Sequence, residues 1–223
     1  FTDTLLGIVA IDDAWGIAIF SIMLALSETV AGNGGALHAL ATGGDAEPHI
    51  VAALAALKEI REAYPDDFHL DWADILILEA RRLMGEQRSP REALERAIAE
   101  AETGITLYPG RPAQYRALGE AHLLRAQWRH SRGGEIAGDV SAGRAAVKRA
   151  LEIDPSLAAA HAVRGRLDLL AAQAAVDETA RMRHAASAAE SLHRALAINP
   201  FMARQVEPLL ARAEQTAAGT APG

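Results

Sequence analysis

The 223-residue chain contains no cysteine, which excludes disulfides, thiolate nucleophiles and cysteine-based zinc sites. Basic residues are absent from residues 1–57, which hold six acids and no Lys or Arg. The rest of the chain carries 23 acids against all 22 bases. This break in charge pattern indicates two segments that lie in different surroundings. The net charge of −7 gives no electrostatic reason to expect a nucleic-acid partner.

Motifs that carry chemistry are also missing. None of the eight histidines forms an H-x-x-x-H or H-E-x-x-H pair, which is the spacing that places two imidazoles on one helix face for a metal. The sequence has no G-x-S-x-G, phosphate-loop or dinucleotide-binding pattern. We therefore expect no catalytic residues, no metal, no cofactor and no enzymatic activity.

What the first segment does contain is an apolar run of membrane-spanning length, residues 5–26, with two adjacent carboxylates near its middle, Asp12 and Asp13. Its eleven Leu, Ile, Phe and Val residues favour insertion by about 3 to 7 kcal/mol, and two central Asp residues cost about 5 to 7 kcal/mol. The balance is near zero. Such a helix needs neighbouring membrane helices to solvate its acids, and acids at that depth are candidates for a functional site.

The stretch TDTLLGIVAIDDAWGIAIFS, with residues up to 43, resembles the Asp-Asp helix of bacterial monovalent cation:proton antiporters of the sodium/hydrogen exchanger superfamily. The resemblance implies that Asp12 and Asp13 bind a monovalent cation and exchange it for protons. Two adjacent carboxylates in a dry site cannot both ionise cheaply, so the pKa of one would rise towards neutrality. Antiport needs the other helices of that family, so we expect cation and proton binding only as part of a complete antiporter.

The second segment has a period set by four prolines, Pro65, Pro109, Pro155 and Pro200, which lie 44, 46 and 45 residues apart. A fixed spacing in this range predicts a helical solenoid. Small and apolar residues recur before three of the prolines at spacings that place them on one helix face. These positions are Ala97, Ala101, Gly104 and Ile105; Gly143, Val147, Ala150 and Leu151; and Ala188, Leu192, Ala195 and Leu196.

The helices expected after each proline begin with Trp72, with Tyr115-x-x-Leu-Gly-x-x-His122, and with His161-x-x-Arg-Gly-x-x-Asp. Together with the phrases ALEIDP and ALAINP, residues 48–213 resemble tetratricopeptide (TPR) repeats. The resemblance implies a groove that binds a peptide or protein through Trp72, Tyr115, His122 and His161. The glycines of the two motifs, Gly119 and Gly165, predict close approach of paired helices. The period of about 45 residues departs from the usual 34, and longer loops or longer helices in residues 129–141 and 172–185 are the two explanations.

Two charged stretches of the second segment are interpreted as solvent-exposed parts of helices. The run from Arg125 to Arg132 mixes bases with Trp128; it favours a solvated helix end, with a nucleic-acid or phosphate contact as the alternative. The charged residues between Glu92 and Glu102 are interpreted as wet surface.

These observations predict an all-α chain: a hydrophobic, transmembrane-type N-terminal helix in residues 1–43, then a TPR-like α-solenoid of antiparallel helix pairs in residues 44–223. The turn-rich residues 41–48 mark the boundary. The leading hypothesis is a non-catalytic scaffold for protein interaction, held at the bacterial inner membrane if residues 5–29 insert, with a soluble repeat domain. One alternative is a fragment of the antiporter, and the other is a chimeric or mis-assembled junction of two parent proteins.

Overall fold

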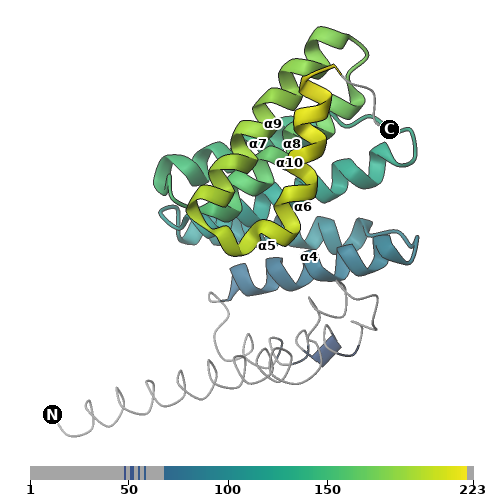
Figure 1. Ribbon diagram of the computed structural model, residues 1–223. Helices are drawn as coiled ribbons and strands as arrows, with labels where there is room; N and C mark the ends of the chain where they lie inside the picture. The colour runs from purple at the N-terminus through teal and green to yellow at the C-terminus, as the bar shows by residue number, and fades with distance from the viewer. Residues whose placement is uncertain (1–47, 49–50, 53–54, 56–57, 59–67, 220–223) are drawn as a thin grey trace, which may run out of the picture.

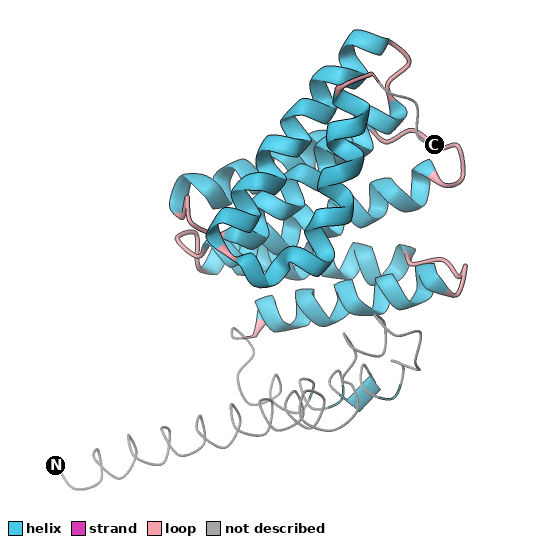
Figure 2. Ribbon diagram, viewed as in Figure 1, coloured by secondary structure: helices cyan, strands magenta, loops and turns pink. Residues whose placement is uncertain are grey.

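The computed structural model describes residues 48, 51–52, 55, 58 and 68–219 of the chain. Every regular element in this part is helical, which confirms the all-α prediction there (Figure 2). The elements are α4 (His69–Gly85), α5 (Arg91–Leu107), α6 (Pro112–His130), α7 (Ala137–Ile153), α8 (Ala158–Ala174), α9 (Glu178–Ile198), the 3-10 turn η1 (Pro200–Met202) and α10 (Ala203–Ala217). The predicted membrane segment with Asp12 and Asp13 lies outside the described residues. Among the helices that are described, none has the length and apolar character needed to cross a bilayer.

The helices stack as an α-solenoid (Figure 1). Short connections join consecutive helices, so neighbours run antiparallel. Alternate helices α4, α6, α8 and α10 also contact one another in succession, and we call them the inner row. Within the described part, α5, α7 and α9 contact the helices before and after them but not one another. Because the inner row runs through all the helix pairs, its exposed side chains form one continuous surface.

The prolines determine where the second helix of each pair ends. The residues before Pro109, Pro155 and Pro200 leave the helical conformation: Tyr108 has φ −133° and ψ 67°, Asp154 φ −134° and ψ 95°, and Asn199 φ −135° and ψ 92°. A proline ring disfavours the helical conformation at the preceding residue, so the helix stops there. Each of these three residues still donates its backbone N–H to the carbonyl four residues earlier, at 2.8 to 2.9 Å. The repeat period inferred from the prolines is therefore a structural period at these three positions.

The extra length of each repeat lies in the helices. The 19-residue α6 and the 17-residue α7 alone exceed a 34-residue unit. Only residues 131–136 separate them, and only residues 175–177 separate α8 from α9, which has 21 residues. Asp177 helps to begin α9, because its side chain accepts a hydrogen bond from the N–H of Ala180 at 2.7 Å. Of the two explanations drawn from the sequence, longer helices account for the period.

The core is continuous along the stack. Three groups of buried apolar side chains follow one another, and each includes a helix pair and residues of the next inner-row helix. The first three positions of each predicted helix face are buried, as in Val147 of α7 and Leu192 of α9, both 0% exposed. The fourth position, at Ile105, Leu151 and Leu196, is half-buried. Sharing a core between neighbours is what stabilises a solenoid, because a single pair buries too little surface alone.

The prediction of close helix approach at Gly119 and Gly165 is confirmed. A Cβ on Gly119 would lie 2.5 Å from Cγ2 of Val147, and a Cβ on Gly165 would lie 2.6 Å from Cγ of Leu192. Carbon atoms do not approach this closely without repulsion. Glycine is therefore required where α6 crosses α7 and where α8 crosses α9.

Candidate functional site

A buried carboxylate on the inner row binds three arginines from three helices. Glu120 of α6 is 8% exposed. Its carboxylate accepts hydrogen bonds from Arg81 of α4, from Arg116 of α6 at 3.0 Å and from Arg166 of α8 at 3.3 Å. Arg116 also donates to both carboxylate oxygens of Asp74 at 2.7 Å. Three guanidinium groups thus share two carboxylates, and we call these five residues the Glu120 cluster.

Electrostatics keeps Glu120 charged. Burial alone would raise the pKa of Glu120, but Arg81, Arg166 and Arg116 together hold that pKa below its ordinary value. Burial lowers the pKa of Arg166, and Arg81 adds to that lowering although Glu120 opposes it. The cluster joins three successive inner-row helices. Its three guanidinium groups outnumber its two carboxylates, so it keeps a surplus of positive charge.

A second polar cluster connects α6 to α7. Asp139 of α7 is 2% exposed. Nε of Arg125 donates to its Oδ1 at 2.7 Å, and Nη1 of Arg129 donates to its Oδ2 at 2.8 Å. Nη2 of Arg125 lies 3.2 Å from Nδ1 of His122. Both arginines therefore anchor α6 on a buried acid. Arg129 is exposed in the last turn of α6, as expected for a solvated helix end, whereas Arg125 is half-buried one turn earlier.

The next repeat carries the same residue types in exchanged positions. Asp168 now lies on the first helix of the pair, α8, and His184 lies on the second, α9. Arg144 donates from Nε to Asp168 at 2.7 Å, and its Nη2 lies 3.2 Å from Nδ1 of His184. Ser187 donates to the other oxygen of Asp168 at 2.8 Å. In both repeats an arginine therefore lies between an aspartate and a histidine.

Both histidines favour the neutral form. Burial lowers the pKa of His122, and Arg125 contributes in the same direction, while Asp139 opposes without cancelling them. Burial and then Arg144 lower the pKa of His184, against Asp168. A guanidinium N–H directed at Nδ1 needs a free lone pair there, which a protonated imidazole lacks.

The lowered pKa values of the two histidines predict that the fold becomes less stable as the pH falls below about 6.5. This loss begins at higher pH than the titration of carboxylates. The unfolded chain binds more protons than the folded chain between the lowered pKa values and about 6.5, so stability is complete above about pH 6.5 and falls below it. Urea unfolding measured between about pH 7.5 and 5.5 should show this loss. The dependence of the unfolding free energy on pH should become weaker in a His122→Gln, His184→Gln double variant. It should persist in His193→Gln, which removes an exposed imidazole. An unchanged slope in the double variant would contradict the assignment.

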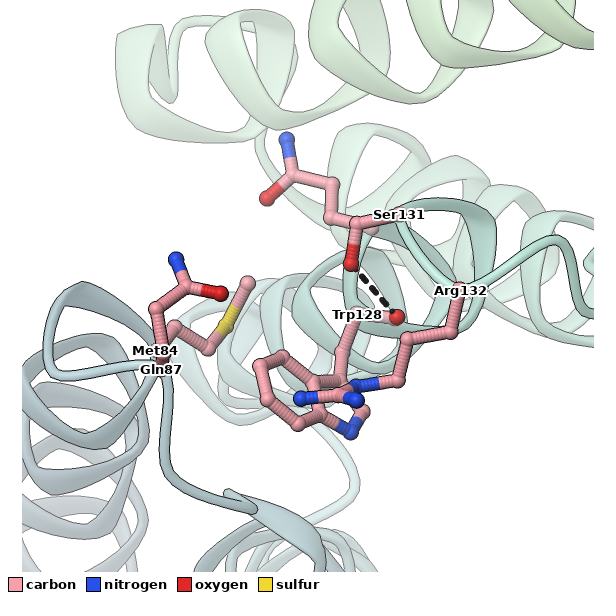
Figure 3. A pocket seen from close by; sticks show the side chains of 6 residues that line it. Met84, Gln87, Trp128, Ser131 and Arg132 are labelled. Carbon is pink, nitrogen blue, oxygen red and sulfur yellow. Dashed lines mark hydrogen bonds between the residues drawn. The ribbon is translucent and has the colours of Figure 1, made fainter.

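Two adjacent pockets lie on the inner row. The first, of about 260 Å³, lies between the end of α4 and the end of α6 (Figure 3). The second, of about 220 Å³, continues from α6 across α8 to α10. Gln127 and Ser131 line both pockets, so we treat the two as one groove and call it the inner groove. The first pocket is lined by Met84, Gln87, Gln127, Trp128, Ser131 and Arg132.

The inner groove combines apolar walls with cations. Figure 3 shows the side chains of Met84 and Gln87 on one side and those of Trp128, Ser131 and Arg132 on the other. The guanidinium of Arg132 stacks on Trp128 at 3.9 Å from the ring centroid, as cations do on aromatic faces. The second pocket contains Arg166 and Arg212 beside Leu169, Leu170 and Leu209. Among the described residues, no Asp or Glu lines either pocket.

The four residues predicted from the sequence to bind a partner lie elsewhere. Trp72 and His122 are 6% and 8% exposed, inside the stack. Tyr115 is half-buried against the core around α7, and His161 donates from Nε2 to the carbonyl of Pro155 at 2.9 Å. None of the four lines either pocket. Their role in binding stays a prediction, and their visible contacts are structural.

Sequence reasoning missed the Glu120 cluster, although one signal was present. Glu120 and Arg166 directly follow the paired glycines, so opposite charges occupy the same position in consecutive repeats. The position of Glu100 also differs from the prediction, which placed its side chain on the solvent-exposed surface. Glu100 is half-buried, and its carboxylate lies 2.7 Å from Nδ1 of His69.

The described part of the chain holds no group of three or more His, Asp or Glu side chains placed to bind a metal ion. Asp12 and Asp13 lie outside it, so their ion-binding role stays a prediction.

No family model, no curated protein and no solved structure matches this chain.

Proposed function

We propose that the chain is a non-catalytic, TPR-like scaffold that binds a peptide or partner protein along its inner groove. The observation that carries this proposal is the pair of adjacent pockets on the inner row, which share Gln127 and Ser131. Repeat proteins bind partners on the continuous surface that stacking creates. The lining supplies amides, cations and apolar walls, which are groups that bind and orient a chain segment.

The ion pairs beside the groove support the same proposal. The Glu120 cluster joins α4, α6 and α8, and Arg166 belongs to both the cluster and the lining of the groove. A surface held in one conformation loses less entropy when it binds, so an extended peptide can bind with useful affinity. Attachment to a membrane through residues 5–29, an antiporter fragment and a junction of two proteins stay predictions, since residues 1–47 lie outside the described part.

Selection from a displayed random-peptide library tests the proposal. The immobilised full chain should enrich peptides that compete with one another for one site. A Gln127→Trp variant places a bulky ring where the two pockets meet and should lose these peptides. Glu190→Trp makes a similar change on the exposed face of α9 and should retain them. Failure to enrich any peptide, or equal binding by Gln127→Trp and the wild type, would reject the groove as a binding site.

A further inference from the structure

The second pocket of the inner groove carries more positive charge than its surroundings neutralise. Arg166 shares Glu120 with Arg81 and Arg116; burial lowers the pKa of Arg166, and the nearby charge of Arg81 adds to that lowering. Arg212 of α10 is exposed, and its guanidinium makes no ion pair within the described part. His130 lines the same pocket. A negative group entering here would meet two guanidiniums and one imidazole, and no Asp or Glu among the described residues lines the pocket, although Glu120 lies behind Arg166 at 3.3 Å.

The apolar part of the groove lies next to this charge. Leu169, Leu170 and Leu209 line the second pocket together with the cations. In the first pocket, the thioether of Met84 and the ring of Trp128 offer an adaptable apolar surface, with Arg132 stacked on the ring (Figure 3). Between the pockets, the Gln127 amide can both donate to and accept from a peptide backbone. The inner groove therefore places cationic and apolar side chains next to one another.

The charge of the repeat segment narrows the class of partner. Beyond residue 57 the chain carries 23 acids against 22 bases, so the groove is a local positive area on a segment of nearly balanced charge. A polyanion such as a nucleic acid needs a broad basic face, which a segment of balanced charge does not supply. A short segment with a few carboxylates matches a local cationic pocket, and bidentate guanidinium–carboxylate pairs suit arginine.

We propose that the partner of the inner groove is an acidic peptide segment in which carboxylates alternate with apolar side chains. This inference rests on the proposed function. The carboxylates pair with Arg166 and Arg212 in the second pocket, and an apolar side chain lies between Met84 and Trp128 in the first. The Gln127 amide holds the backbone between them.

Fluorescence anisotropy with three labelled decapeptides tests the proposal on the full chain. One peptide alternates Glu with Leu, the second replaces Glu by Gln, and the third replaces Glu by Lys. We expect the Glu peptide to bind at least about tenfold more tightly than the Gln peptide, and the Lys peptide to bind more weakly still. Raising the salt from about 50 to 500 mM should weaken the Glu peptide most, because salt screens exposed charges.

Matched variants locate the site. Arg212→Gln should weaken binding of the Glu peptide by about tenfold without changing the melting temperature, because Arg212 is exposed. Arg204→Gln removes the same charge from another exposed position on α10 and should leave binding unchanged. Met84→Ala should weaken all apolar-containing peptides by a few fold.

The outcomes separate this inference from the function on which it rests. Equal affinity for the Glu and Gln peptides, equal behaviour of Arg212→Gln and Arg204→Gln, or tighter binding of a single-stranded oligonucleotide than of the Glu peptide would each overturn the acidic-peptide proposal. Enrichment of neutral peptides from the library would then leave the scaffold standing. If no decapeptide binds and the library yields nothing, both proposals fail.

Discussion

Glu120→Gln is expected to cost about 3 kcal/mol of folding free energy, because it leaves three arginines around a neutral amide. The carboxylate is 8% exposed, and Arg81, Arg116 and Arg166 donate to it from three helices. Removing one partner from a buried charge cluster is more damaging than removing the whole cluster, since the remaining charges lose their compensation. For a domain of this size the loss corresponds to a fall in melting temperature of about 6 to 12 °C.

Thermal and urea unfolding followed by circular dichroism would measure this effect. Glu190→Gln, on the exposed face of α9, makes the same chemical change without burial and should alter stability by less than about 0.5 kcal/mol. We also expect a broader transition in Glu120→Gln, because the cluster couples three successive inner-row helices and solenoid cooperativity depends on coupling between neighbours. Equal stability of the two variants would show that the cluster contributes nothing to the fold.

Gly165→Ala is expected to destabilise the protein by about 1 to 3 kcal/mol, although alanine is the better helix former. The new methyl carbon would lie 2.6 Å from Cγ and 2.8 Å from Cδ2 of Leu192, which is 0% exposed and cannot move aside freely. It would also lie 3.1 Å from the carbonyl oxygen of Ala188. Helices α8 and α9 must therefore separate or Leu192 must leave its rotamer.

The matched control is Gly138→Ala in α7, where an added Cβ meets no atom within 4 Å. This substitution should be neutral or stabilise by up to about 1 kcal/mol, so the same chemical change has opposite signs at the two positions. A Gly165→Ala, Leu192→Ala double variant should be more stable than the sum of its single variants predicts, because the alanine methyl fills part of the space that the leucine leaves. Additive losses would contradict a direct clash.

The repeat was predictable from the sequence because its determinants are local. A proline restricts the residue before it, and a glycine records a close helix approach, so Pro109, Pro155, Gly119 and Gly165 could each be interpreted without three-dimensional information. The buried apolar positions were equally predictable, since helical periodicity is enough to place them on one face of a helix.

The polar clusters and the groove were not predictable in the same way. Arg81 and Glu120 are 39 residues apart, and Glu120 and Arg166 are 46 apart. Each residue alone resembles an ordinary surface charge, and only the stacking of the inner row brings them together. The same holds for Trp128, whose position beside Met84 depends on how α4 packs against α6. The residues that were predicted to form the groove match helix-packing positions of the repeat, and burial of Trp72 and His122 fits that origin.

The shared φ of −133° to −135° at Tyr108, Asp154 and Asn199 has a consequence for how such an array can grow. Units that end in the same kind of bend add to a stack with similar orientations. Duplication of one whole unit would lengthen the inner row and keep the order of the stack, whereas insertion of part of a unit would break the alignment of every later helix. Changes in length are therefore tolerated in complete multiples of the repeat.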